Sequence, residues 1–278
     1  MIWKTSRTSL DLTENSQIMG ILNTTPDSFS DGGQFDSLET ALHQARKMIA
    51  EGTCIIDIGG ESTRPGSLPV SPEEEIRRTA PIISAIRNEW DGLISIDTQK
   101  AAVARVALEA GADIINDVSG LIADPDMAAL CATSNCGIVI MHMQGTPADM
   151  QENPDYQDIL AEIRAYFLER LHTLTSLGID PSRLCFDPGI GFGKTLTHNL
   201  TLISHLGDLA PPGSPLLLGL SRKSFLSKLS NCPETHLRDA PTHAFTALAR
   251  QKNVMLHRVH DVAGNLASLR ATESLLSY

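Results

Sequence analysis

The chain has 278 residues, a net charge of −11 and a pI of about 5.2. This length suits one α/β barrel better than two average domains, so we expect a single domain over residues 1–278. The acidic balance argues against nucleic acid as the main partner. No apolar run in the sequence approaches the roughly 18 residues of a membrane-spanning helix, so we expect no membrane partner either.

The cysteines and the first residues indicate a compartment. The five cysteines are scattered and form no C-x-x-C pair, which is typical of reduced thiols in a cytosolic protein. The opening residues carry no apolar segment of the kind that marks a secretory signal. We therefore expect a cytoplasmic protein.

Eight short runs rich in Ile, Leu and Val recur along the chain, as parallel strands covered on both faces would require. They span residues 17–22, 54–58, 93–96, 113–118, 137–141, 183–186, 215–220 and 254–259. Helical patterns alternate with them, over residues 38–49, from 71 onward, and over 99–110, 126–132, 158–177, 197–209, 241–251 and 263–276. This alternation predicts an α/β fold, a (β/α)8 TIM barrel, with the residues before 17 as a short N-terminal plug.

The first two helices carry the clearest boundary signals. Gly52 follows the first helical pattern as a stop signal, and Ser71 with Pro72 opens the second as an N-cap and a first-turn proline. The competing architecture is a doubly wound open sheet. It is disfavoured because the Gly-rich dinucleotide turn expected after its first strand is absent.

Polar residues gather at the C-terminal ends of the predicted strands. They are Asn23, residues 61–64, Asp97, Asn116, His142, Asp187, residues 221–224 and residues 258–261. In a barrel all these positions face one mouth, where such enzymes carry out their chemistry. Each residue alone has an ordinary structural explanation, such as a satisfied carboxylate, a turn or an ion pair. Their shared location is what favours a functional site.

Two groups among these polar residues suit different parts of a ligand. Asp97, Asn116 and Asp187 place two carboxylates and an amide among apolar walls, which suits a fused aminopyrimidine ring, and Lys223 can donate to the same ring. Arg64, Arg258 and His260 form a cationic group near the loops after strands seven and eight, the usual phosphate site of this fold. The alternative for Arg258 and His260 is an ion pair with a neighbouring acid.

Two stretches rich in Gly, Ser and Thr, residues 23–33 and 59–66, are predicted to be mobile lids. A third Gly-rich stretch, residues 189–195, resembles a phosphate-binding P-loop, but Pro188 stands where that motif needs glycine. We therefore expect its glycines to let the backbone approach a flat ligand. His142, flanked by two methionines, is expected to be a packed side chain and not a metal ligand.

Eight motifs in this order resemble the dihydropteroate synthase family, and together they cover nearly the whole chain. They are MGILNTTPDSFSDGG (19–33), IDIGGESTRPG (56–66), SIDT (95–98), INDVSG (115–120), MHMQGTP (141–147), DPGIGFGK (187–194), GLSRKSF (219–225) and RVHDV (258–262).

The resemblance implies an enzyme, a transferase of folate biosynthesis, that joins (7,8-dihydropterin-6-yl)methyl diphosphate to p-aminobenzoate and releases diphosphate. It implies roles for matching residues: Asp97, Asn116, Asp187 and Lys223 at the pterin with Met141 as a wall, Thr63, Arg64, Arg258 and His260 at the diphosphate, and Phe29, Ser62, Thr63, Arg64, Pro65, Phe192 and Ser224 around p-aminobenzoate. It also implies Asn23 as a ligand of Mg²⁺ and a homodimer of this chain.

The implied mechanism is dissociative, with Asp97, Lys223, Arg258 and His260 as the catalytic set. Asp97 would favour a delocalised pterin cation, while Mg²⁺, Arg258 and His260 would stabilise the departing diphosphate. Two other functions remain open: a pterin-binding methyltransferase subunit, and a paralogue that binds ligand without turnover. The chain also departs from the family pattern at His243, His257 and residues 252–253, where we expect altered packing of helices and of the dimer surface.

Overall fold

A computed structural model describes residues 1–24 and 34–278 of the chain. Eight of its strands form one parallel sheet in the order β8-β7-β6-β5-β4-β3-β10-β9. Their bounds are β3 Gln17–Asn23, β4 Ile55–Gly59, β5 Leu93–Asp97, β6 Ile114–Asp117, β7 Gly137–Met141, β8 Leu184–Asp187, β9 Leu217–Leu218 and β10 Leu256–Val259. A parallel bridge between Phe186 and Leu216 joins the two end strands, so the predicted barrel is confirmed.

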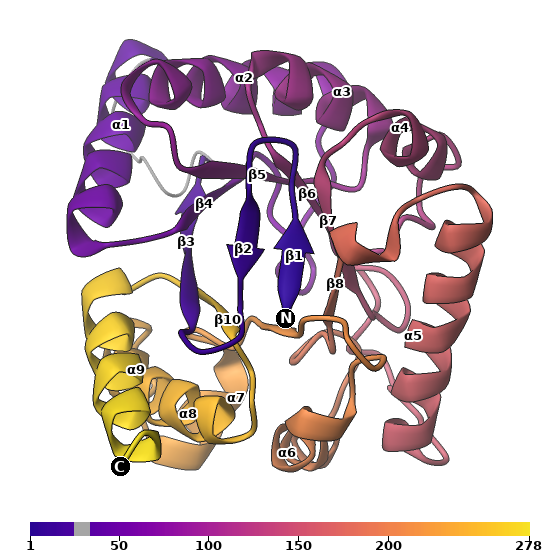
Figure 1. The fold of residues 1–278 in the computed structure, drawn as a ribbon, viewed down its shortest axis with the longest axis vertical. Helices are drawn as coiled ribbons and strands as arrows, with labels where there is room; N and C mark the ends of the chain where they lie inside the picture. Colours follow the sequence, from indigo (N-terminus) through magenta and orange to yellow (C-terminus); the bar gives the residue numbers. More distant parts are fainter. Residues whose placement is uncertain (25–33) are drawn as a thin grey trace.

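Helices surround this barrel on the outside (Figure 1). They are α1 Gln34–Glu51, α2 Pro72–Glu89, α3 Ala101–Ala110, α4 Met127–Thr133, α5 Ile159–Ser176, α6 Leu196–Ser204, α7 Ser224–Ser230, α8 Asp239–Gln251 and α9 Val262–Leu276. The Ser71 hydroxyl caps α2 by accepting from Glu74 N at 3.3 Å, and Gly52 ends α1 with φ +96°, as expected.

Two elements differ from the sequence-based expectation. The seventh barrel strand was expected over residues 215–220, but β9 keeps only two residues in the regular ladder, because its pairing with β8 is reduced to a bridge and one bond from Phe186 N to Pro215 O. No helix was predicted between residues 220 and 241, yet the segment after β9 forms α7. Ser224 is therefore the first residue of a helix.

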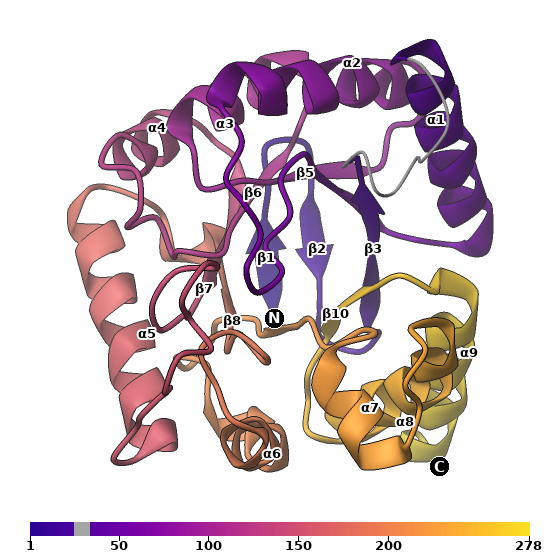
Figure 2. The same ribbon diagram turned by 180° about the vertical axis from the view of Figure 1, so that it is seen from behind.

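The N-terminal residues form a hairpin that closes the bottom of the barrel. Strand β1 (Ile2–Lys4) pairs antiparallel with β2 (Ser9–Asp11). Trp3 is fully buried among residues at the start of the barrel strands, including Met19, Ile55 and Leu256, and its indole N–H donates to Arg183 O at 2.8 Å. Figure 1 shows the hairpin in front of the barrel and Figure 2, from behind, shows it on the far side. The predicted plug is confirmed.

Apolar side chains bury both faces of the barrel strands. Every residue of β4, β5 and β7 is buried, because one face looks into the barrel and the other contacts the helices. A carboxylate within such a strand has no access to solvent unless it looks toward the mouth. The strands thus hold the few polar residues at their C-terminal ends in a rigid frame.

Candidate active site

The sheet register places three predicted site residues in one row across the mouth. Asn23 pairs with Gly59, Gly59 with Asp97, and Asp97 with Asn116. Both Asn23 Oδ1 and Asp97 Oδ2 lie within 4 Å of the point where a Cβ on Gly59 would stand, at 3.8 and 3.7 Å. The glycine therefore leaves open the space between these two side chains. Asp187, at the end of β8, pairs with Met141 on the opposite side.

A buried cluster of charged and polar groups lies in the barrel throat. Arg258 Nε donates to Asp57 Oδ2 at 2.6 Å, and its Nη2 donates to Asp97 Oδ2 at 2.7 Å. Asn116 Nδ2 donates to the same Asp57 oxygen at 3.1 Å. Arg258 thus forms ion pairs with neighbouring acids, as the alternative interpretation of this residue predicted.

Asp57 was not predicted as a site residue, although it is fully buried and contacts two residues that were. The signal was present in the sequence, because a charged residue interrupts the otherwise apolar strand Ile55–Gly59. A buried charge of this kind needs a partner, and Arg258 is that partner here.

Burial controls the protonation of both acids expected to meet a pterin ring. Burial raises the pKa of Asp97 to about 7; the charge of Arg258 opposes this rise, and Asp57 adds to it. Burial also raises the pKa of Asp187, against the charge of Lys223 and the hydrogen bond from Gly189 N at 2.7 Å. The two carboxyls are thus prepared to exchange or share protons with a ligand that carries ring nitrogens.

Lys223 lies beside the aromatic ring of Phe192. Its Nζ is 4.4 Å from the ring centroid, within the range of a cation–π contact, and it donates to the Ile190 carbonyl. Burial lowers the pKa of Lys223 to about 8, while the nearby Asp187 carboxylate opposes that change. Lys223 can therefore act as a donor to a ligand seated between it and Asp187.

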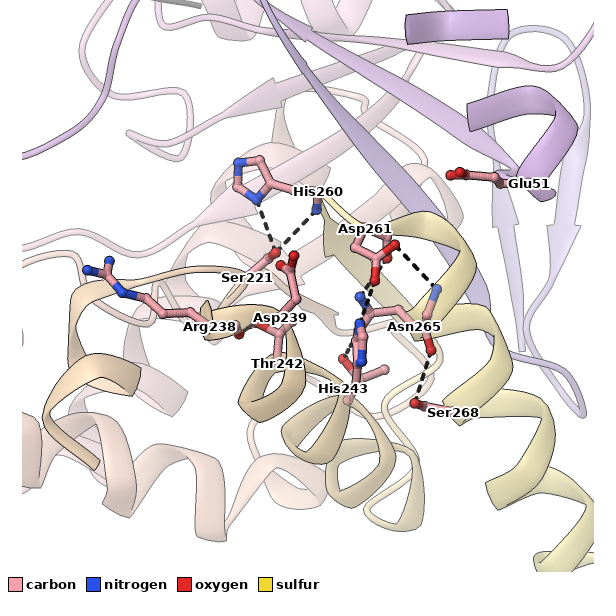
Figure 3. A network of polar contacts seen from close by, with 12 residues as sticks. Glu51, Ser221, Arg238, Asp239, Thr242, His243, His260, Asp261, Asn265 and Ser268 are labelled. Carbon is pink, nitrogen blue, oxygen red and sulfur yellow. Dashed lines mark hydrogen bonds and ion pairs between the residues drawn. The ribbon is translucent and has the colours of Figure 1, made fainter. Parts of the chain in front are cut away.

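His260 lies on the β10–α9 connection and contacts Ser221, three residues after the end of β9. The Ser221 hydroxyl contacts His260 Nδ1 at 3.0 Å and accepts from its backbone N–H at 3.2 Å (Figure 3). Burial, together with the charges of Arg222 and Arg258, lowers the pKa of His260 to about 3. Burial therefore favours a neutral imidazole at pH 7, while the assignment of His260 to the diphosphate stays a prediction.

The other predicted residues lie on the loop after β4, at the start of α7 and at the end of β7. Thr63 is half-buried, whereas Arg64, Pro65 and Ser224 are exposed, and Met141 is buried at the end of β7. The Arg64 charge contributes to the lowered pKa of His260, so these two residues lie within electrostatic range of each other. Phe29 falls outside the described residues.

Two glycines of residues 189–193 lie against backbone. A Cβ on Gly189, where φ is +66°, would lie 1.9 Å from His142 O, and a Cβ on Gly193 would lie 2.5 Å from Gln144 O, so these two make room for the backbone after β7. A Cβ on Gly191 would instead lie 3.1 Å from Lys223 Cδ, and the approach of a flat ligand there stays a prediction. His142 is packed, as expected, against the Tyr156 and Tyr166 rings.

A metal at this site would have few protein ligands. Within residues 1–24 and 34–278, no three His, Cys, Asp or Glu side chains gather in a way that could hold a metal ion. Asn23 offers one amide oxygen at the mouth, beside Asp97. This donor set fits Mg²⁺, which keeps several waters and is commonly bound through one or two protein ligands together with substrate phosphates.

The chain matches the family model for pterin binding enzymes over residues 19–260. It is thus a pterin-binding enzyme on a (β/α)8 barrel. A relative from Synechocystis, a dihydropteroate synthase, is 46% identical over 97% of this chain and 93% of its own length. The chain belongs to the dihydropteroate synthase family, a family of transferases.

Solved structures of this family have the same fold. The dihydropteroate synthase of Yersinia pestis, solved with a sulfonamide drug, is 40% identical with a TM-score of 0.93, and each chain covers 100% of the other. The Xanthomonas albilineans enzyme in complex with 7,8-dihydropteroate is 37% identical with a TM-score of 0.88, over 97% of both chains. No helix in the described part of this chain is long and apolar enough to cross a membrane.

Proposed function

We propose that this chain condenses (7,8-dihydropterin-6-yl)methyl diphosphate with p-aminobenzoate, giving 7,8-dihydropteroate and diphosphate. The observation that carries the proposal is the cluster in which Arg258 bonds Asp97 and Asp57 while Asn116 bonds Asp57. It places acids, an amide and a cation in a buried throat, which an aminopyrimidine ring can satisfy. The family relationship supplies the reaction type.

The pterin ring is assigned to the throat of the barrel. Asp97, Asn116 and Asp187 accept from or donate to its ring nitrogens and amino group, and Lys223 donates to its carbonyl. Met141 lies buried at the end of β7 and supplies an apolar wall. The carboxylate of Asp97 stabilises the positive charge that develops on the pterin when the bond to diphosphate breaks.

The diphosphate is assigned to the outer part of the mouth. Arg64 and Thr63 come from the loop after β4, and His260 lies ahead of the amino end of α9, whose amides favour anions. Neutral His260 can donate one hydrogen bond from Nε2 while Ser221 holds Nδ1. Arg258 Nη1 has no hydrogen bond within the described residues, so this nitrogen can serve an oxygen of the leaving group.

We assign one Mg²⁺ ion to the diphosphate, with Asn23 as its protein ligand. When bound, this ion supplies positive charge to the leaving-group oxygens. The aromatic amine of p-aminobenzoate attacks the exocyclic carbon from the rim, which we assign to Phe29, Phe192, Ser224 and residues 62–65. We further propose a homodimer that works in the cytoplasm.

One assay tests the function against its alternatives. Diphosphate release is measured with both substrates, with each alone, and with the two mixed without enzyme. A synthase releases diphosphate only when both substrates are present with the enzyme. A methyltransferase subunit or a binding-only paralogue releases none in any arm, and that result would overturn the proposal.

A further inference from the structure

A half-buried lysine outside the assigned site fixes the loop that carries Arg64. Lys100 Nζ donates to Glu61 Oε2 at 2.6 Å and to Glu75 Oε2 at 2.5 Å. Lys100 is the residue before helix α3, three positions after Asp97, and its backbone N–H donates to Thr98 Oγ1 at 3.2 Å. The lysine is therefore anchored to the end of the strand that presents Asp97.

Glu61 joins the two ends of the loop after β4. Besides Lys100, its Oε2 accepts from the backbone N–H of Val70 at 2.8 Å, so one oxygen closes the segment 61–70. Thr63, Arg64 and Pro65 lie inside this closed segment. Its far side has a second attachment, because Gly66 N donates to Pro147 O at 3.1 Å. The position of the loop thus depends on where Glu61 is held.

Glu75 fixes Lys100 from the opposite side. It lies on α2, is only 1% exposed, and its Oε1 has no hydrogen-bond partner within the described residues. Gly60, next to Glu61, packs against the same helix, since a Cβ there would lie 2.9 Å from Glu75 Cγ. Two carboxylates therefore share one ammonium group, and removing that group leaves a buried charge without a partner.

We infer that Lys100 is a positioning residue that holds Arg64 and Thr63 at the diphosphate through its bond with Glu61. This inference rests on the proposed function, because it assumes that these two residues meet the diphosphate. Lys100 contacts neither substrate in this arrangement. Its loss should weaken binding of the anion and leave the pterin pocket intact, because Asn116, Asp187 and Lys223 lie on other elements and Asp97 is held by Arg258.

Calorimetry with two probes tests the inference in the full chain. Inorganic pyrophosphate with Mg²⁺ reports the anion site, and a dihydropterin with a hydroxymethyl group in place of the diphosphate ester reports the throat. In Lys100→Met we expect pyrophosphate to bind about tenfold more weakly, a size typical of coupling between sites. Pterin affinity should stay within about twofold. Lys100→Arg, which keeps the charge, should restore pyrophosphate affinity.

Two further variants keep the test decisive if Lys100→Met folds poorly. Lys100→Met combined with Glu75→Gln removes the stranded buried charge and should show the same selective loss. Glu61→Gln keeps an acceptor for Val70 N but loses the ion pair, so its effect and that of Lys100→Met should not add. Lys47→Met, which breaks an exposed ion pair with Glu51 on α1, is the matched control and should change neither affinity.

Unchanged pyrophosphate binding in these variants would overturn the inference, and so would an equal loss for both probes. The wild-type chain separates this failure from failure of the proposed function. If the wild type releases diphosphate when both substrates are present while Lys100→Met binds pyrophosphate normally, only the inference about Lys100 is rejected. If the wild type neither turns over nor binds pyrophosphate, the inference and the proposed function are both rejected.

Discussion

Arg258 and Asp97 are joined by a hydrogen-bonded ion pair of 2.7 Å, although they are assigned to different parts of the substrate. Asp97 is assigned to the pterin ring and Arg258 to the diphosphate. The same guanidinium also bonds Asp57 at 2.6 Å. The two halves of the first substrate are therefore expected to bind on either side of one shared ion pair, so a change in one half affects the charge that meets the other.

Asp97→Asn tests the charge of the throat. The amide preserves size and can still accept from Arg258, so the fold should persist. Without the carboxylate, the developing pterin cation loses about 3 kcal/mol of stabilisation, and kcat should fall roughly 100-fold. Steady-state kinetics measures this, with Asp91→Asn, at a fully exposed side chain, as the control. Near-normal kcat in Asp97→Asn would contradict the cation mechanism.

Arg258→Ala tests the assignment of the leaving group. The pterin diphosphate ester should lose about 1.5–3 kcal/mol of binding free energy, because charged hydrogen bonds to its oxygens disappear. A pterin without phosphates should lose much less. Calorimetry of both ligands gives the difference. An equal loss for both would remove Arg258 from the diphosphate.

The same substitution should lower stability, and this effect needs its own control. Arg258→Ala leaves Asp57 and Asp97 buried without their cation, which commonly costs about 3–5 kcal/mol. Combining it with Asp57→Asn removes one of these charges and should recover part of the loss in denaturant unfolding. The binding comparison is then made in the double variant.

Ordered binding is expected if anion binding at Asn23, the last residue of β3, and at Arg64, on the loop after β4, completes the rim. Pyrophosphate with Mg²⁺ should position Arg64 and so tighten binding of p-aminobenzoate at least about tenfold, as coupling energies of about 1–3 kcal/mol allow. The measurement titrates p-aminobenzoate, or a sulfonamide mimic, with and without pyrophosphate while a pterin is present. Identical affinities would show that the anion does not prepare the rim.

His257 provides a test of pH-dependent stability. This side chain is 1% exposed, and burial lowers its pKa to about 4. Because the folded-state pKa lies below the unfolded value of 6.5, the neutral ring favours folding above pH 6.5, and this stability is lost as pH falls towards 4. Between pH 6.5 and 5 the loss is about 2 kcal/mol.

Comparison with a variant isolates this contribution. Burial raises the pKa values of acids such as Asp97 and Asp117, so their protonation stabilises the fold as pH falls over the same range. The pH dependence of wild-type stability alone is therefore the sum of these opposite effects. The free-energy difference between wild type and His257→Gln should therefore shrink as pH falls from 6.5 to 5. His236→Gln, at an exposed histidine, should show no such trend. A constant difference for His257→Gln would refute the assignment.

The barrel and the location of its mouth could be predicted from the sequence, because both follow from periodicity. Strand runs of Ile, Leu and Val fix the two buried faces, and polar residues at their ends mark the mouth. Family motifs then assigned roles that geometry alone could not. The structure added what spacing does not encode: Arg258 reaches across the barrel to β4 and β5, on strands far away in sequence.

Charge states and indirect contacts were harder to predict. His260 was grouped with Arg258 because the two lie two residues apart near the usual phosphate loops, yet its charge depends on burial that only the fold reveals. Lys100 was not singled out, and Glu61 only as part of the polar stretch 61–64. Lys100 joins Glu61 to Glu75, and Glu75 lies on a helix whose acidic first turn is already explained by the helix dipole. Helix α7 was missed because its seven residues are too few for a clear helical period.

The hairpin beneath the barrel has a consequence for the order of folding. Trp3 is synthesised before every barrel strand, but its partners include Arg183 near β8 and Leu256 on β10, the last strand of the barrel. The hairpin must therefore wait until all barrel strands have been made before it reaches its final contacts. Trp3 lacks its buried contacts throughout that interval, and completion of β10 is the event that supplies them.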